Sequence, residues 1–240
     1  MQRRAMAPYE ARRPNLEYNP RNMGNEEEER RSKALADDGG ILPYHEAFYL
    51  QMIVYIASRA MSAFQRFDEA VTEGQNPSDI YATAQEALTH AAALSRVFWP
   101  TPRELRDMTL ARGATLRAAF NLTDGSPLED RTLRNSLEHF DERLDRFLLQ
   151  DNAGHFFPDP IVGPLDQARQ PSVYTFRLVD PQASTFVLLG QEHEFGPLRS
   201  AIGTVLIDAQ RMYGNGARLD QPTPPNQRPS DSPQSPEVPR

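Results

Sequence analysis

Residues 43–73 read PYHEAFYLQMIVYIASRAMSAFQRFDEAVTE, and this stretch decides the fold class. Apolar side chains recur along it at the spacing of one face of an α-helix. They are Ala47, Leu50, Val54, Ala57, Met61, Phe64 and Val71. The middle of the stretch, residues 52–56, is apolar nearly all round, so we expect this helix to be the most buried one.

Further helices are expected at residues 78–98, 101–122 and 127–150. The last two each begin with a capping box, in which Ser or Thr is followed by Pro and then by Glu, at residues 101–104 and 126–129. Short connections between helices make neighbours antiparallel. The sequence therefore predicts a mainly α fold, with an up-and-down four-helix bundle over residues 41–151.

Residues 152–213 predict a smaller unit packed on this bundle. It consists of a Pro-rich loop, a β-hairpin with strands at 173–179 and 185–190, and a helix from Pro197 to Tyr213. His193, just before this helix, is expected to be an ordinary loop residue. Residues 1–40 are polar and charged, and residues 214–240 carry seven prolines, so a disordered leader and a disordered tail are predicted.

The composition excludes several kinds of chemistry. The chain has no Cys, which excludes disulfides, thiolate catalysis and Cys-based zinc sites, and its five His are scattered. We expect no metal and no cofactor. The first residues lack the apolar core of a signal peptide, and the longest apolar run, residues 48–57, is too short to span a bilayer. A cytoplasmic protein without membrane contact is predicted.

The net charge of −7 argues against a broad nucleic-acid-binding surface. A local contact with RNA remains open, through arginines such as Arg103, Arg106, Arg112 and Arg117. The alternative is that these arginines belong to a solvated helix face.

The segment Leu133-Arg134-Asn135-Ser136-Leu137-Glu138-His139-Phe140 contains the pattern R-N-x-x-x-H. On a continuous helix, Asn135 and His139 point nearly the same way, whereas Arg134 lies about 140° and about 7.5 Å along the axis from His139. None of the three lies on the predicted apolar stripe, which is Leu133, Leu137, Phe140, Leu144 and Phe147. A site here needs a second wall, which predicts a homodimer. The alternative is an ordinary exposed face, because the opposite charges spaced four apart in this helix suit any solvated helix.

The pattern resembles the signature of the HEPN superfamily, which are small helical bundles that include metal-independent ribonucleases. The resemblance covers residues 43–151 in arrangement and is specific only over residues 134–139. It implies an endoribonuclease of toxin or defence type. His139 would be general base or acid at the ribose 2′-hydroxyl and its leaving group, Arg134 would stabilise charge on the phosphate, and Asn135 would orient the group. RNA and a neutralising antitoxin, often nucleotidyltransferase-like, would be the partners. The alternative is a non-catalytic helical-bundle interaction or adaptor protein.

Overall fold

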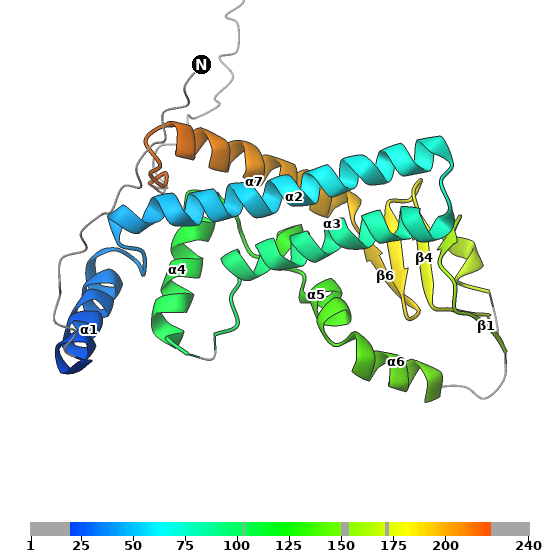
Figure 1. Ribbon diagram of the computed structural model, residues 1–240, viewed down its shortest axis with the longest axis horizontal. Helices are drawn as coiled ribbons and strands as arrows, with labels where there is room; N and C mark the ends of the chain where they lie inside the picture. The colour runs from blue at the N-terminus through cyan, green and yellow to red at the C-terminus, as the bar shows by residue number, and fades with distance from the viewer. Residues whose placement is uncertain (1–19, 103, 150–153, 171–172, 222–240) are drawn as a thin grey trace, which may run out of the picture.

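Two long helices, α2 (Glu46–Glu73) and α3 (Pro77–Phe98), lie side by side at the centre of the fold (Figure 1). The computed structural model describes residues 20–102, 104–149, 154–170 and 173–221, without the side chains of residues 20–23 and 134. A short 3-10 turn, η1 (Pro43–His45), precedes α2. Gly74 ends α2 with a φ of 63°, a left-handed conformation that favours glycine. The predictions for both helices are confirmed.

Helix α7 (Gly196–Gly214) packs along α2 and completes this centre. Phe195, at its start, has its ring centroid 5.7 Å from those of both Phe64 and Phe67 of α2. The Arg199 guanidinium donates to both carboxylate oxygens of Asp68, at 3.0 and 2.5 Å. The helix was expected as part of an appendage. That expectation is wrong, because α2, α3 and α7 share one hydrophobic core.

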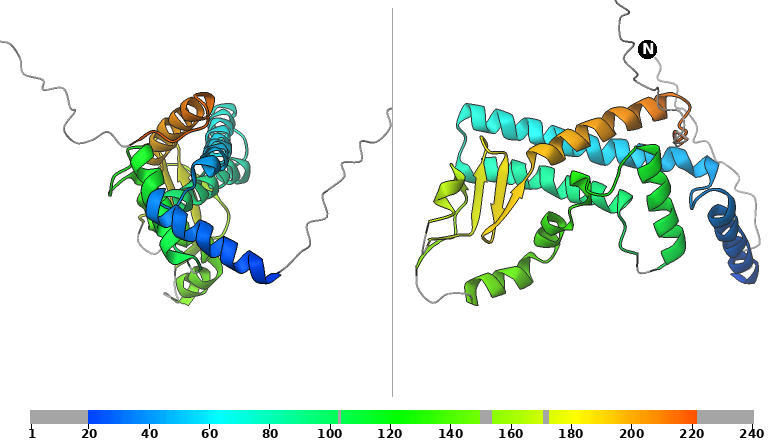
Figure 2. Two further views of the ribbon diagram at one scale, coloured as in Figure 1. Left: turned by 90° about the vertical axis from the view of Figure 1, so that its left-hand side faces the viewer. Right: turned by 180° about the vertical axis from the view of Figure 1, so that it is seen from behind.

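The β-strands lie at one end of these helices, and α1 (Pro20–Asp37) lies at the other (Figures 1 and 2). The predicted hairpin is confirmed as β4 (Arg177–Asp180) and β5 (Thr185–Leu188), paired antiparallel. β6 (Gln191–Glu194) and β2 (Ile161–Val162) extend it to a sheet in the order β2-β4-β5-β6, and η3 (Leu165–Gln167) follows β2. β1 (His155–Phe157) and β3 (Val173–Thr175) form a separate parallel pair. Phe186 of β5 stacks on Tyr81 of α3 at 4.7 Å, so the sheet packs on the helical core.

The range predicted as a disordered leader contains a helix, α1 (Pro20–Asp37). Most of its exposed side chains are charged, and some pair within the helix, as Arg30 does with Glu26 at 3.6 Å. Among the side chains of α1 that the structure describes, Ala34 is fully buried. At Gly40, which has a φ of 86°, a Cβ would lie 2.6 Å from the backbone nitrogen of Arg112, so the chain after α1 passes very close to α4 (Arg106–Ala119). The prediction failed because this contact leaves almost no apolar pattern.

Helix α4 (Arg106–Ala119) is shorter than the predicted helix 101–122. It starts after Leu105, whose φ is 45°, so the expected capping box at Thr101 does not begin the helix. Gly113 lets α4 approach α3 closely, because a Cβ there would lie 2.7 Å from Pro100 Cδ and 3.0 Å from Phe98 O.

The segment after α7 folds back onto the start of α2, although a disordered tail was predicted from residue 214. Leu219 is 8% exposed. Its backbone N–H donates to Glu46 Oε2 at 2.7 Å. The segment after α7 therefore packs on the start of α2 at least as far as Leu219. The rest of the predicted tail, residues 222–240, and residues 1–19 of the leader lie outside the described residues.

Candidate functional site

The predicted fourth helix is divided into three pieces: η2 (Pro127–Glu129), α5 (Arg131–Glu138) and α6 (Phe140–Leu149). Ser126 caps η2, as its hydroxyl accepts the N–H of Leu128. Asp130 then caps α5, with its Oδ1 accepting the N–H of Thr132 at 2.7 Å. Because Asp130 is the N-cap of α5, a new helix begins after η2. The expectation of one continuous helix over residues 127–150 is therefore wrong.

His139 forms the break between α5 and α6, with φ −112° and ψ 39°. Its N–H still donates to Asn135 O at 3.1 Å, and its carbonyl accepts from Arg143 N at 3.1 Å. The break redirects the apolar side chains that follow. Phe140 meets Phe176 edge to face at 5.7 Å, and Phe147 meets Tyr174 at 6.4 Å. The predicted stripe therefore divides its contacts. Leu133 is buried in the core, whereas Phe140 also meets Phe176, between β3 and β4, and Phe147 meets Tyr174 of β3.

The predicted site residues lie on both sides of this break. Asn135 is half-buried, and the His139 side chain is 57% exposed, with its Nδ1 4.0 Å from Glu142 Oε2. Both side chains line one shallow hollow of about 290 Å³, together with Glu142, Arg143 and Arg146. The backbone of Arg134 lies in α5, and its side chain is outside the described part of the chain. The structure thus brings Asn135 and His139 together and leaves the place of the Arg134 guanidinium undescribed.

Glu138, inside the motif, is tied to the core. Its carboxylate accepts from Arg96 of α3 in an ion pair. The contact holds the end of α5 against α3. Glu138 is therefore a structural member of the motif segment.

A second hollow, of about 130 Å³, lies on the other side of Arg143 and Arg146. It is lined by Ser136, Arg143, Arg146, Phe147, Leu188, Leu189 and Gln191. Arg143 Nη1 donates to Ser136 Oγ at 2.7 Å and to Gln191 Oε1 at 2.5 Å. The sequence reasoning missed both arginines. Their spacing after His139, four and seven residues, is the signal that could have placed them on one helix face.

Of the arginines proposed for RNA contact, Arg112 and Arg117 are engaged in packing. Arg112 lies over the Tyr49 ring, and Arg117 lies over the Trp99 ring and donates to Phe98 O at 2.6 Å. Residue 103 is outside the described residues. Arg112 and Arg117 therefore fix α4 to its neighbours.

His193 is not the loop residue that was expected. It lies in β6 and is 5% exposed. It lines a small cavity of about 30 Å³ with Ser95 and Asp130, between α3, η2, α7 and the sheet. His193 Nε2 and Ser95 Oγ are both buried and, among the described residues, have no hydrogen-bond partner. Burial lowers the pKa of His193, Asp130 opposes this shift, and Arg143 adds to it.

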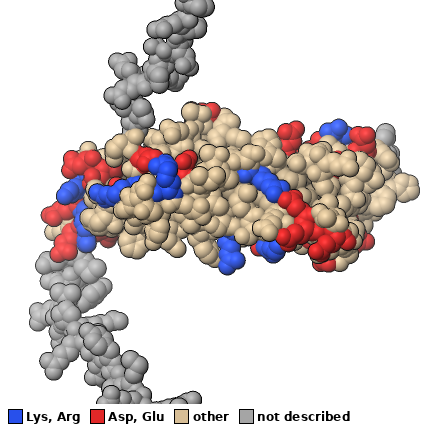
Figure 3. Space-filling view, turned by 90° about the horizontal axis from the view of Figure 1, so that it is seen from above, with Lys and Arg blue, Asp and Glu red and all other residues tan. Residues whose placement is uncertain are grey.

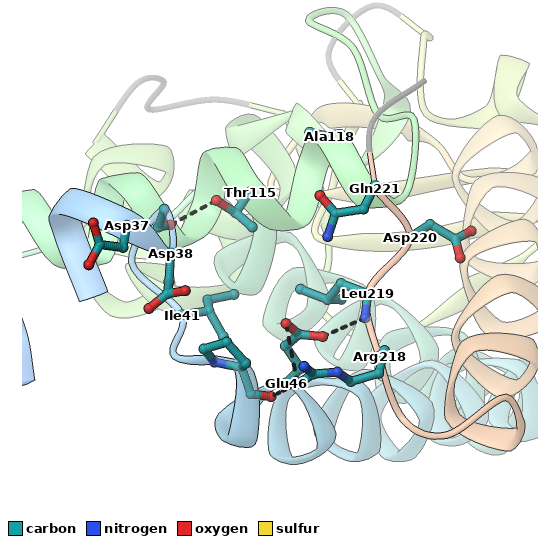
Figure 4. Close-up of a pocket in the computed structure, with 12 residues that line it drawn as sticks. Asp37, Asp38, Ile41, Glu46, Thr115, Ala118, Arg218, Leu219, Asp220 and Gln221 are labelled. Carbon is teal, nitrogen blue, oxygen red and sulfur yellow. Dashed lines mark hydrogen bonds and ion pairs between the residues drawn. The ribbon is translucent and has the colours of Figure 1, made fainter. Parts of the chain in front are cut away.

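A further hollow, of about 410 Å³, lies where α1, α2, α4 and the segment after α7 meet (Figure 4). Asp37, Asp38, Glu46 and Asp220 make it acidic. Arg218 crosses it, donating to Pro43 O and lying 3.8 Å from Glu46. Its lining contains none of the predicted site residues, and its contacts serve to dock the C-terminal segment.

Comparison with protein-family models, curated proteins and solved structures gives no match to this chain. Within the part of the chain that the structure describes, no helix has the length and apolar character needed to cross a membrane. The same residues contain no group of three or more metal-ligand side chains placed to share an ion. The interpretation of the site therefore rests on its own geometry.

Proposed function

We propose that the protein contacts RNA through the α5–α6 hollow and cleaves it as a HEPN-like endoribonuclease. The observation that supports this most is that Asn135 and His139 share one hollow with Arg143 and Arg146. A general acid or base beside fixed cationic groups is the arrangement that phosphodiester cleavage needs.

In the proposed reaction the ribose 2′-oxygen attacks phosphorus while the bond from phosphorus to the 5′-oxygen breaks. His139 accepts the 2′-hydroxyl proton, and the leaving 5′-oxygen takes up a proton from water. Glu142 Oε2 lies 4.0 Å from His139 Nδ1 on the same side of the hollow. Arg134 stabilises the charge on the phosphate, and Asn135 orients the group.

A second copy of the chain completes this proposal. The hollow is shallow and His139 is mostly exposed, so one protomer encloses a substrate on one side only. A two-fold dimer would place the same residues of both chains around one cleft. The neutralising antitoxin and the HEPN-like bundle arrangement likewise stay predictions.

The test is cleavage of single-stranded and structured RNA by the purified full-length protein, in the presence of EDTA. Arg134→Ala and His139→Ala should each reduce the rate by about 10²–10⁴-fold. Both should keep the circular dichroism spectrum and melting temperature of the wild type. His155→Ala is the matched control, because His155 is an exposed histidine outside the hollow.

Two results would contradict the proposal. One is wild-type protein, free of any inhibitory partner, that leaves both kinds of RNA intact. The other is a loss of activity in the His155 variant equal to that in the His139 variant.

A non-catalytic interaction module is the second candidate, favoured by exposed apolar side chains on the two adjacent helices α2 and α7. Phe48 and Ile207 are 72% and 69% exposed, and Tyr55 and Tyr213 are also exposed. Figure 3, which looks down on these helices, shows a broad uncharged area between more charged ends. Groups of large exposed apolar side chains are typical of protein-binding surfaces. If RNA stays intact in the test above, the interaction module is the function that remains.

A further inference from the structure

The guanidinium of Arg143 is fixed in place without losing its charge. Its two acceptors, Ser136 Oγ at 2.7 Å and Gln191 Oε1 at 2.5 Å, are both neutral. Other described arginines, such as Arg96 and Arg199, are held by carboxylates. A carboxylate cancels most of the positive charge, whereas a hydroxyl and an amide oxygen only orient the group. Arg143 therefore presents an oriented, uncompensated cation.

The two groups that orient Arg143 belong to different parts of the fold. Ser136 is 1% exposed, and its Oγ lies 2.8 Å from Thr132 O within α5. Gln191 begins β6, where it pairs with Leu188 of β5. Because a buried helix residue and a paired strand residue both hold it, the guanidinium is positioned before any ligand arrives. Such preorganisation reduces the entropy lost on binding.

Arg146 adds a second cation one turn further along α6. It lies three positions after Arg143, so the two are neighbours on one helix face. Both line the hollow of about 290 Å³ and the hollow of about 130 Å³, which makes them the ridge between the two. Among the described side chains, neither forms an ion pair with a carboxylate. Glu142 is the one acidic residue in these linings, and it lies next to His139.

We propose that Arg143 and Arg146 form an oxyanion site that takes a phosphate group. Guanidinium groups match phosphate oxygens in charge and in planar, two-point geometry. Since His139 lines the larger hollow beside the same arginines, a phosphate bound there lies next to the imidazole. Assigning this phosphate to the RNA backbone rests on the proposed function, whereas the oxyanion site itself does not.

The test is calorimetric titration of the full-length protein at low ionic strength with two probes. One probe is inorganic phosphate, and the other is a short single-stranded RNA whose 2′-hydroxyls are methylated and which therefore cannot be cleaved by 2′-attack. Arg143→Gln and Arg146→Gln should each weaken binding by about tenfold or more, because a charge-assisted contact is lost. Arg143→Lys, which keeps the charge but loses the planar fork, should weaken it less. Arg169→Gln is the control: it removes the same charge from an arginine already paired with Glu192, and affinity should change less than about twofold.

The outcomes separate this inference from the ribonuclease proposal. Binding by wild-type protein that both hollow variants lose supports the site, even if no RNA is cleaved. His139→Ala should abolish cleavage and keep binding. Binding of phosphate without the oligonucleotide supports a site for a free phosphate and removes the RNA backbone as its ligand. Wild-type protein that binds neither probe, or variants Arg143→Gln and Arg146→Gln that bind both as well as wild type does, would overturn the inference.

Discussion

The replacement Ile202→Ala tests whether α7 belongs to the central core. Ile202 is fully buried in α7, within the core shared with α2 and α3. Truncating such a side chain to alanine removes apolar contacts and leaves a cavity, which destabilises a protein by about 2–5 kcal/mol. For a folded unit of this size, each kcal/mol corresponds to about 2–4 °C. We therefore expect the melting temperature to fall by roughly 4–20 °C.

The matched control is Ile207→Ala on the same helix. Ile207 is 69% exposed, so the same chemical change should alter the unfolding free energy by about 0.5 kcal/mol or less. Urea unfolding, followed by circular dichroism and by the fluorescence of Trp99, measures both variants. If α7 is central, each variant unfolds in one transition seen by both probes. Equal stabilities of the two variants, or two transitions of which Ile202→Ala shifts only one, would refute the shared core.

Two further predictions concern pH and the C-terminal segment. Burial lowers the pKa of His193 in the folded state, so the unfolded chain takes up a proton below about pH 6.5 while the folded chain does not. The stability that neutral His193 contributes is complete above that pH and is lost as the pH falls toward the folded-state pKa. Between pH 7.5 and 5, the unfolding free energy of His193→Gln should therefore fall less than that of the wild type. An equal fall in both proteins would exclude His193 as the source of the pH dependence. Separately, Glu46→Gln should speed tryptic cleavage after Arg218, as judged by fragment mass, because Glu46 accepts the Leu219 N–H and lies 3.8 Å from Arg218. Glu73→Gln, at the far end of α2, should cleave like the wild type, and equal rates in all three proteins would show that Glu46 does not hold the segment.

The sequence was sufficient where structure follows from local pattern. The apolar spacing of residues 43–73 and 78–98 located α2 and α3. The two predicted strands on either side of residues 180–184 located the β4–β5 hairpin. Helix α7 was also placed within a residue at each end. These elements have a buried face long enough for its period to be read directly.

The candidate site was predicted only in part. Asn135 and His139 were identified from the motif, and the structure places both on one hollow. Arg143 and Arg146 were missed because their role depends on contacts with residues distant in the sequence. Arg143, for example, is oriented by Gln191, 48 residues away. His193 was misjudged for a similar reason, since its burial depends on α3, η2 and α7 closing around β6.

The sequence by itself determined that the chain is mainly helical, where most of its helices lie and which motif it carries. Only the tertiary structure decided that α7 is central, that α1 docks through Ala34, and that the predicted fourth helix breaks at His139. A periodic pattern states which side chains prefer burial, but not against which partner. Local helix preferences differ by less than about 1 kcal/mol per residue, whereas burying one large apolar side chain contributes about 1.5–3 kcal/mol. The packing of Phe140 against Phe176 and of Phe147 against Tyr174 therefore outweighs continuation of one helix through His139.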